Sequence, residues 1–458
     1  MQTTRILHSM QVQKMYKKII TMTLTALCMY TTPLFSSDTH QKELSSSSKA
    51  IYVEVASKKG EKKKWLGVIV GKTAHSLHEV GEAVKRALEY TGLVDVDLRY
   101  ADKRLHKKEV LDLKSLGYAC VIFIEENNDY KTLEWRAYDT NKGSMQKGFS
   151  VKKEGKLPRG WGYALADSII ELAGQRPFAS CKLAYCQKRD GKSPQYEICV
   201  ADFDGSHPQV ISKSKRQLLG IRWNRDEESP MILFSRYTPI NIQLVSRSLS
   251  GTETIASNFD GLNMLPTFSI DGKEVVLCLS RDGSSQLYQY GYNHKLKKIG
   301  YTRLTYNHGN NIYPTFLDNG DLVFCSDFET GTPYIYYLNR KEDAIERLTS
   351  GAASAAPSYN SATNNIMFTK VVEGVMQIFL CDLTTKKERQ ITFDKGHKQE
   401  CGFSPCGNFI VYGIQEGPYQ RIISYSLLTK TKRTLTAGDV SCSYPVWSSI
   451  YRQFPVVV

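Results

Sequence analysis

The second half of the chain alternates short apolar runs with polar turns, and this alternation repeats at a nearly constant interval. Each repeat begins at an aromatic anchor, which usually closes a Pro-x-aromatic phrase; the six anchors are Trp223, Phe268, Phe316, Tyr359, Phe403 and Trp447. Successive anchors lie 45, 48, 43, 44 and 44 residues apart. A period of about 40–50 residues with four short strands per repeat is typical of a β-propeller. The pattern therefore predicts a propeller and favours binding over catalysis as its function.

The positions inside each repeat support four strands. After the anchor Phe268, a turn leads into an apolar run at 274–279, a second turn at 282–283 and an alternating strand at 286–290. The repeat ends on a Leu-Thr pair at 304–305, and similar pairs end the later repeats. Turn glycines between strands of period two indicate hairpins. Because one four-stranded unit cannot bury both of its faces, neighbouring units must stack around an axis.

The ends of this region determine the number of blades. Only residues 448–458 follow the last anchor, which is too little chain for a blade, whereas β-rich runs at 182–186 and 196–202 precede the first anchor. We therefore expect the C-terminal strand to complete the blade that these runs begin. Such closure gives a six-bladed ring and removes its open sheet edges. A five- or seven-bladed ring with one misread repeat is the alternative.

The N-terminal pattern is different. Basic residues at 17–18 precede an apolar stretch at 19–30, and small residues follow it. This arrangement is typical of a cleaved secretory signal peptide and is too short for a spanning helix. We assign residues 1–37 to the signal peptide, with Met15 as an alternative start, and residues 38–50 to a Ser-rich flexible segment. No other apolar run is long enough to span a bilayer, so we expect an exported protein without membrane insertion.

A small domain is predicted between the signal and the propeller. Residues 51–175 contain two amphipathic helical patterns, at 76–90 and 162–173, and β-rich runs at 51–55, 65–70, 94–100, 118–124 and 133–138. The first helical pattern opens on a capping box, Ser76-x-x-Glu79. These patterns predict an α+β domain with a mixed sheet and two helices. The propeller is then expected to occupy residues 176–458, which are all-β.

The charge distribution and the cysteines limit the kinds of ligand that we expect the protein to bind. The formal net charge is +14; four basic and no acidic residues precede Asp38, so +10 remains after removal of the signal. The densest basic run, at 58–64, carries no interleaved aromatic residues, so nucleic-acid binding is not expected. No zinc-type spacing of cysteine and histidine is present, and several cysteines lie among apolar residues of predicted strands. We interpret the cysteines as structural and expect neither a metal nor a cofactor.

Three classes of enzyme share features with this sequence. The glycine-containing run at 67–73 has three residues between its glycines where a phosphate-binding loop needs four, so we interpret it as a buried strand and a turn. A propeller peptidase needs Gly-x-Ser-x-Gly in a hydrolase domain, and neither is present. A propeller lactonase or another enzyme with a channel site stays open as the alternative to a binding protein. The loop histidines, which are His207, His294, His308 and His397, are spaced by blade rather than clustered.

Two stretches carry a specific resemblance to a known family. Residues 164–178, ALADSIIELAGQRPF, and residues 266–272, PTFSIDG, resemble the helix-to-blade junction and a blade phrase of the TolB family. The resemblance covers residues 51–458. It implies a monomeric periplasmic component of the Tol–Pal system that supports outer-membrane integrity and envelope constriction during cell division. It also implies two partners, a Pal-like peptidoglycan-associated lipoprotein and a TolA-like inner-membrane protein.

The resemblance assigns each partner to a different part of the chain. The lipoprotein is expected on one rim of the propeller, at Asn263, Met264, Leu265, Asn310, Asn311, Ile312 and Tyr313. The TolA-like protein is expected at the N-terminal segment Ile51, Tyr52, Val53, Glu54 and Val55. The chain departs from the family in both parts. A Ser-rich extension precedes the N-terminal segment, which makes the expected TolA epitope internal rather than terminal. Leu262, Ile312 and Tyr313 stand where the family has a histidine, a threonine and a glutamate, so the Pal-like partner is expected to be recognised with different chemistry.

Overall fold

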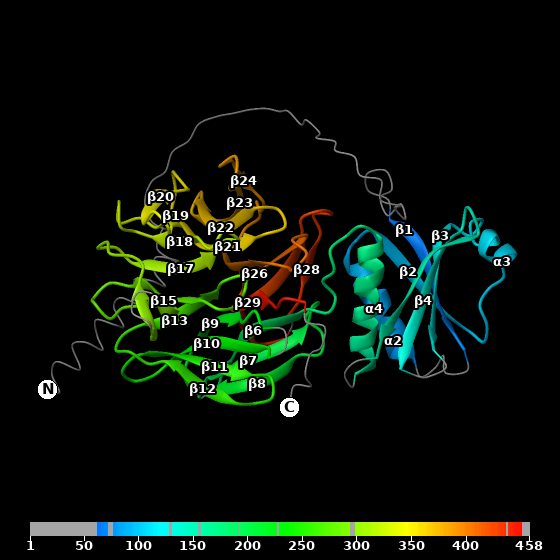
Figure 1. Cartoon of the computed structure of the whole chain (residues 1–458), viewed down its shortest axis with the longest axis horizontal. Coiled ribbons are helices and arrows are strands. Elements are labelled where there is room, and N and C mark those ends of the chain that lie inside the picture. The colour runs from blue at the N-terminus through cyan, green and yellow to red at the C-terminus, as the bar shows by residue number, and fades with distance from the viewer. Residues whose placement is uncertain are drawn as a thin grey trace. The chain divides into compact units, whose positions relative to one another are not determined.

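The computed structural model describes residues 62–450 except 72–76, 128–130, 154–156, 192, 227–228, 294–297 and 437. These residues fall into two compact units, divided in the sequence between Ser180 and Cys181. The first unit runs from blue through cyan to blue-green in Figure 1, and the second runs from green to red. The predicted signal peptide, the Ser-rich segment and the N-terminal segment 51–55 lie outside the described residues.

The first unit is built on a five-stranded mixed sheet in the order β2-β1-β3-β4-β5. The central strand β1 runs parallel to β2 and β3, whereas β4 and β5 continue antiparallel from β3. Its strands are β1 (Lys63–Val70), β2 (Val94–Ala101), β3 (Tyr118–Glu126), β4 (Thr132–Asp139) and β5 (Ser144–Lys152). The apolar side chains of β1 and β3 are almost fully buried, which is typical of strands covered on both faces.

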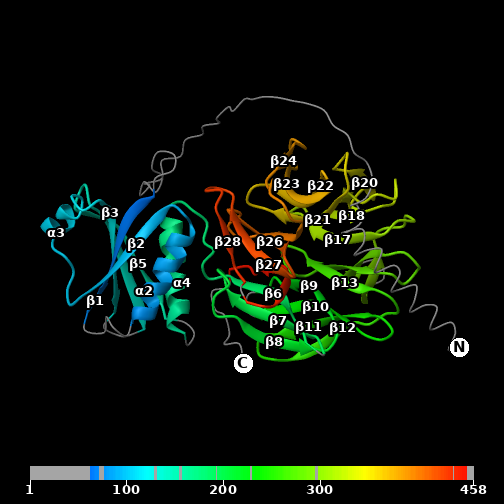
Figure 2. The same ribbon diagram turned by 180° about the vertical axis from the view of Figure 1, so that it is seen from behind.

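Two long helices pack side by side on one face of this sheet, α2 (His78–Tyr90) and α4 (Pro158–Leu172) (Figure 2). Their close approach requires a glycine, because a Cβ at Gly162 would lie 2.5 Å from the backbone oxygen of Val80. Within α4, the buried carboxylate of Asp167 accepts the backbone N–H groups of Phe178, Ala179 and Ser180, which follow the helix, at 2.7–2.8 Å. The acidic residue of the junction stretch therefore fixes the chain as it leaves α4.

The boundaries of this unit differ from the prediction in three places. The helix α4 begins at Pro158 rather than at residue 162, because proline is favoured in the first helical turn. The short helix α3 (Lys107–Asp112) buries only Val110, and so it has no apolar periodicity to predict it. The edge strand β5 is rich in polar residues and contains Gly148, where a Cβ would lie 3.0 Å from the backbone oxygen of Trp135. The predicted N-cap Ser76 lies outside the described residues.

The second unit consists of six four-stranded antiparallel sheets, as the repeat predicted. Blade 1 contains β29 (Ser441–Trp447), β6 (Lys182–Arg189), β7 (Gln195–Asp202) and β8 (Gln209–Ser214). Blade 2 contains β9 (Leu218–Trp223), β10 (Met231–Tyr237), β11 (Ile242–Ser248) and β12 (Glu253–Ser257). Blade 3 contains β13 (Asn263–Phe268), β14 (Val275–Leu279), β15 (Gln286–Asn293) and β16 (Lys298–Arg303).

The remaining blades repeat this arrangement. Blade 4 contains β17 (Asn311–Phe316), β18 (Leu322–Ser326), β19 (Tyr334–Asn339) and β20 (Ala344–Arg347). Blade 5 contains β21 (Ser354–Asn360), β22 (Asn365–Val372), β23 (Val375–Asp382) and β24 (Glu388–Gln390). Blade 6 contains β25 (Lys398–Phe403), β26 (Phe409–Glu416), β27 (Tyr419–Ser426) and β28 (Lys432–Thr434). The strands β9, β13, β17, β21, β25 and β29 contact one another in a closed ring, so they are the inner strands around the axis.

The ring closes through the C-terminal strand, which confirms the predicted six-bladed closure. β29 pairs antiparallel with β6, and the backbone N–H of Ser448 donates to the carbonyl of Lys182 at 2.8 Å. The indole Nε1 of the last anchor, Trp447, donates to the carbonyl of Phe203 at 2.8 Å. Strands from both ends of the propeller sequence therefore form one sheet.

The Pro-x-aromatic phrases and the Leu-Thr pairs of the repeats each have a structural role. Each inner strand carries a bulge three residues before its aromatic anchor, at a residue with a left-handed backbone; these residues are Gly220, Leu265, Tyr313, Ala356, Glu400 and Tyr444. In four blades the next residue is a proline. The proline lacks an N–H group, but the bulge places it outside the ladder, so no strand hydrogen bond is lost. The threonines of the Leu-Thr and Ile-Thr pairs accept a backbone N–H of the third strand at 2.9–3.0 Å; they are Thr305, Thr349, Thr392 and Thr436.

Candidate functional site

Six crossover loops run from the outer strand of one blade to the inner strand of the next. Because the blades repeat around an axis, these loops lie at the same end of the ring, which we call the loop mouth. Its described residues are 215–217, 258–262, 304–310, 348–353, 391–397, 435–436 and 438–440. The turn between β10 and β11 reaches the same end, since Asn241 Nδ2 donates to Asn258 Oδ1 and to the carbonyl of Phe259.

The first group of predicted rim residues lies at the start of β13 and is buried. Asn263, Met264 and Leu265 are 0%, 3% and 1% exposed. The Asn263 side chain accepts Ser257 Oγ and the Phe259 N–H, and it donates to the carbonyls of Ile242 and Phe259. This amide therefore fixes the crossover loop from inside.

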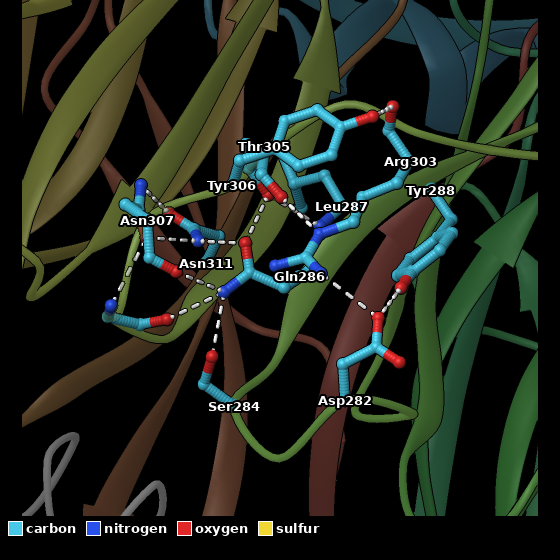
Figure 3. A network of polar contacts seen from close by, with 11 residues as sticks. Asp282, Ser284, Gln286, Leu287, Tyr288, Arg303, Thr305, Tyr306, Asn307 and Asn311 are labelled. Carbon is cyan, nitrogen blue, oxygen red and sulfur yellow. Dashed lines mark hydrogen bonds and ion pairs between the residues drawn. The ribbon is translucent and has the colours of Figure 1, made fainter.

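The second predicted group lies at the start of β17, and Figure 3 shows the polar network that holds it. Asn311 is fully buried and donates through Nδ2 to Gln286 Oε1 at 2.9 Å and to Asn307 Oδ1 at 2.8 Å. Gln286 also accepts Thr305 Oγ1 at 2.8 Å, and its Nε2 donates to the carbonyl of Asn307 at 2.9 Å. The network joins the third strand of blade 3 to the first strand of blade 4.

The neighbours of Asn311 complete this junction. The backbone N–H of Asn310 donates to Asp327 Oδ1 at 2.6 Å, while its side-chain oxygen accepts the N–H of Ser285. Ile312 and Tyr313 belong to the hydrophobic core between the blades and are 6% and 8% exposed. The structure thus brings the seven predicted rim residues to the loop mouth and its inner strands, where they position loops whose exposed surface is formed by other residues.

Tyr306 is an exposed residue that directly follows Thr305 of this network. Its side chain is 68% exposed, yet its hydroxyl donates to the carbonyl of Arg303 at 3.2 Å. The Arg303 guanidinium lies 5.0 Å from the centre of the ring and donates to Asp282 Oδ2 at 3.0 Å and to the carbonyl of Thr305 at 2.6 Å. Figure 3 shows Tyr306 beside Thr305, with Arg303 extending toward Asp282. Tyr306 is therefore an exposed aromatic ring whose hydroxyl and face both contact Arg303.

Two further large apolar side chains are exposed at this end, Phe393 at 75% and Ile240 at 68%. Phe393 follows Thr392 as Tyr306 follows Thr305, so the two aromatics occupy equivalent places in their repeats. The sequence prediction did not include Phe393 and Tyr306, because it named the residues shortly before each anchor. An aromatic residue directly after a Leu-Thr or Ile-Thr pair is the sequence pattern that would have indicated both. Aromatic side chains of this kind are the common anchors of protein interfaces.

The described residues show little sign of reactive chemistry. Within them, no group of three or more His, Cys, Asp or Glu side chains could hold a metal ion. Their ten cysteines are all free and buried. Burial raises the pKa of the Cys199 thiol to about 12, so it stays protonated and unreactive near neutral pH.

None of the helices in the described part of the chain is long and apolar enough to cross a bilayer.

The family model of the TolB β-propeller domain matches residues 170–451, which is more than half of the chain. The chain belongs to the TolB β-propeller family. This confirms the resemblance that the sequence carries. The Tol-Pal system protein TolB of Francisella tularensis subsp. mediasiatica is 29% identical over 279 residues, covering 58% of this chain and 62% of that protein. The chain thus spans 62% of the length of that relative.

Two other TolB proteins cover more of the chain. The Tol-Pal system protein TolB of Helicobacter pylori strain 26695 is 24% identical over 389 residues, covering 78% of this chain and 84% of that protein. The crystal structure of TolB from Acinetobacter baumannii superposes with a TM-score of 0.72 at 20% identity, covering 85% of this chain and 97% of that chain. The superposition shows that the two proteins share a fold, a six-bladed propeller with an N-terminal α+β unit.

Proposed function

We propose that this protein is a non-catalytic, monomeric component of a Tol–Pal system in the periplasm, exported by a cleaved signal peptide. In this role it supports outer-membrane integrity and envelope constriction during cell division. The proposal is supported by membership of the TolB propeller family and by relatives named Tol-Pal system proteins. The proposed role requires neither a cofactor nor a nucleic-acid partner.

We infer that the loop mouth binds a Pal-like peptidoglycan-associated lipoprotein. The observation that carries this inference is Tyr306, an exposed aromatic residue held by Arg303 above the buried Asn311 network. A side chain that is already fixed loses little conformational entropy on binding. In this proposal Asn263, Met264, Leu265 and the residues 310–313 keep the loops in the binding conformation, and the exposed side chains make the contact.

The N-terminal segment, Ile51 to Val55, is proposed to bind a TolA-like inner-membrane protein. Its alternating Ile51, Val53 and Val55 suit the addition of a strand to a partner sheet. Replacing residues 52–54 with Gly-Ser sequence should abolish binding to the TolA-like protein while the lipoprotein is still bound. Deleting residues 38–50 should leave both interactions intact; loss of TolA binding on that deletion would place the epitope in the extension.

The protein class is tested by purification from cross-linked cell envelopes. We expect a peptidoglycan-associated lipoprotein to be recovered with the exported protein. Recovery without that lipoprotein, in cells that express it, would contradict the proposal. A variant with the signal residues 1–37 removed serves as the control, because it should stay in the cytoplasm and recover no envelope protein.

A further inference from the structure

Blade 1 carries an excess of positive charge where it meets the loop mouth. Its second strand β6 ends there, because Lys188 pairs with Ser441 at the start of the closing strand β29. Its outer strand β8 leads directly into the crossover loop 215–217. The described residues of the segments 187–197 and 211–217 include five cations and two carboxylates, and so have a formal charge of +3. The cations are Lys188, Arg189, Lys213, Lys215 and Arg216.

A buried carboxylate anchors two of these cations. Glu197 is 3% exposed; its Oε2 accepts Arg189 Nε at 3.0 Å and Gln187 Nε2 at 2.9 Å. Its Oε1 lies 3.8 Å from Lys213 Nζ. The ladder brings these groups together, since Glu197 pairs with Gln187 on one side and with Lys213 on the other. The side chains of Arg189 and Lys213 are 54% and 62% exposed, so the buried charge anchors two cations that stay at the surface.

The other charges of these segments leave the excess unbalanced. Lys188 Nζ pairs with Asp190 Oδ1 at 2.6 Å, so both carboxylates already have cationic partners. Lys215 and Arg216 are exposed in the crossover loop, and neither forms an ion pair with another described residue. We call Arg189, Lys213, Lys215 and Arg216 the blade 1 surface.

The positive excess belongs to one side of the mouth. The crossover loop that enters β29 adds Asp439, but Arg421 of blade 6 donates to the carbonyls on either side of it. Blade 4 lies on the opposite side of the ring, as the positions of β7 and β18 show in Figure 1 and Figure 2. Its corresponding segments, 324–336 and 344–353, carry no positive excess; their charged residues are Asp327, Glu329, Glu346, which pairs with Lys386 of blade 5, and Arg347.

We propose that the blade 1 surface binds an acidic patch on the protein partner of the loop mouth. The planar guanidinium matches a carboxylate with two parallel hydrogen bonds, and lysines add charge without fixed geometry. Opposite charges across an interface speed association and fix the orientation of the partner. The inference deepens the proposed function, on which it rests for the identity of the partner, and it adds that the docking face of that partner is acidic where it meets blade 1.

The composition of the blade 1 surface favours a protein over a lipid surface. A peripheral membrane site combines cations with large apolar side chains that enter the bilayer. The described residues of segments 187–197 and 211–217 expose no large apolar side chain. The exposed apolar residues of the loop mouth, Ile240, Tyr306 and Phe393, lie in other blades, where they suit a protein interface that continues onto blade 1.

Association kinetics of charge-reversed variants test this surface. The full chain is mixed by stopped flow with the soluble domain of the Pal-like lipoprotein. Lys215→Glu with Arg216→Glu should lower the association rate constant at least about tenfold at about 50 mM salt, and much less at about 500 mM, because salt screens the attraction. Lys273→Glu with Lys341→Glu is the matched control; it makes the same change in net charge at exposed turns at the other end of the strands, and should stay within about twofold of the wild type.

A peptide probe tests the surface independently of the lipoprotein. A labelled octapeptide of alternating glutamate and glycine should bind the wild type and the control, while Lys215→Glu with Arg216→Glu should lose at least about tenfold in affinity by fluorescence anisotropy. If this result holds and the lipoprotein does not bind, the proposed identity of the partner is wrong and the acidic chemistry stands. Equal losses in both variants, or no loss in either, would overturn the proposal. Binding to phosphatidylglycerol vesicles that the Lys215→Glu, Arg216→Glu variant loses, with peptide binding unchanged, would overturn it in favour of a lipid surface.

Discussion

At the residue scale, single buried amides hold the crossover loops in place. Asn311→Ala would leave Gln286 Oε1 and Asn307 Oδ1 each without one donor in a buried network. We expect a loss of about 1–3 kcal/mol in the free energy of unfolding, because unsatisfied buried polar groups are costly. Urea titration measures it, with Asn319→Ala as the control, since Asn319 donates only in an exposed turn. Equal stabilities of the two variants would contradict the role assigned to the network.

Glu400 gives a second prediction at this scale. Burial raises its folded-state pKa to about 7 from the ordinary value of 4.5, so the protonated form is favoured by folding. The corresponding stability is fully present below about pH 4.5 and is lost as the pH rises through 7. Glu400→Gln keeps an acceptor for the N–H of Tyr444, so it should be more stable than the wild type at pH 8, by up to about 3 kcal/mol. The advantage should vanish near pH 4, below the unfolded-state pKa; an advantage independent of pH would contradict the raised pKa.

At the element scale, the anchor interval predicted the blades and their closure because each anchor marks the same place in an inner strand. It could not predict the exposure of the residues before the anchors. Asn263 and Asn311, which the resemblance assigned to the partner-binding rim, lie two residues before the left-handed bulges at Leu265 and Tyr313 and are fully buried. The edge strand β5 and the short helix α3 were missed because polar edges and single turns have no apolar period.

The closing strand offers a test at the same scale. Removing the chain from Ser441 onward would delete β29 and leave β6 with an unpaired edge. We expect aggregation or the loss of a cooperative calorimetric transition, because an open propeller exposes apolar blade faces as well as sheet edges. Trp447→Phe is the matched control; it removes one hydrogen bond, to the carbonyl of Phe203, and should lower stability by about 1–2 kcal/mol while unfolding stays cooperative. A truncated protein that melts like the intact one would contradict the closure.

At the scale of the whole molecule, the described residues combine a six-bladed scaffold with one end, the loop mouth, that presents exposed large apolar side chains. The central claim is that this loop mouth binds a Pal-like lipoprotein. Calorimetric titration with the soluble domain of the lipoprotein from the same cells tests it most directly. Tyr306 and Phe393 are mutated to alanine together, and Ile270→Ala is the control, an exposed apolar residue in the turn between β13 and β14 at the other end of the strands.

The double variant should lose at least about tenfold in affinity while its melting midpoint stays close to that of the wild type, because both side chains are largely exposed. Ile270→Ala should bind as the wild type does. Unchanged affinity of the double variant, or no binding by the wild type, would contradict the account.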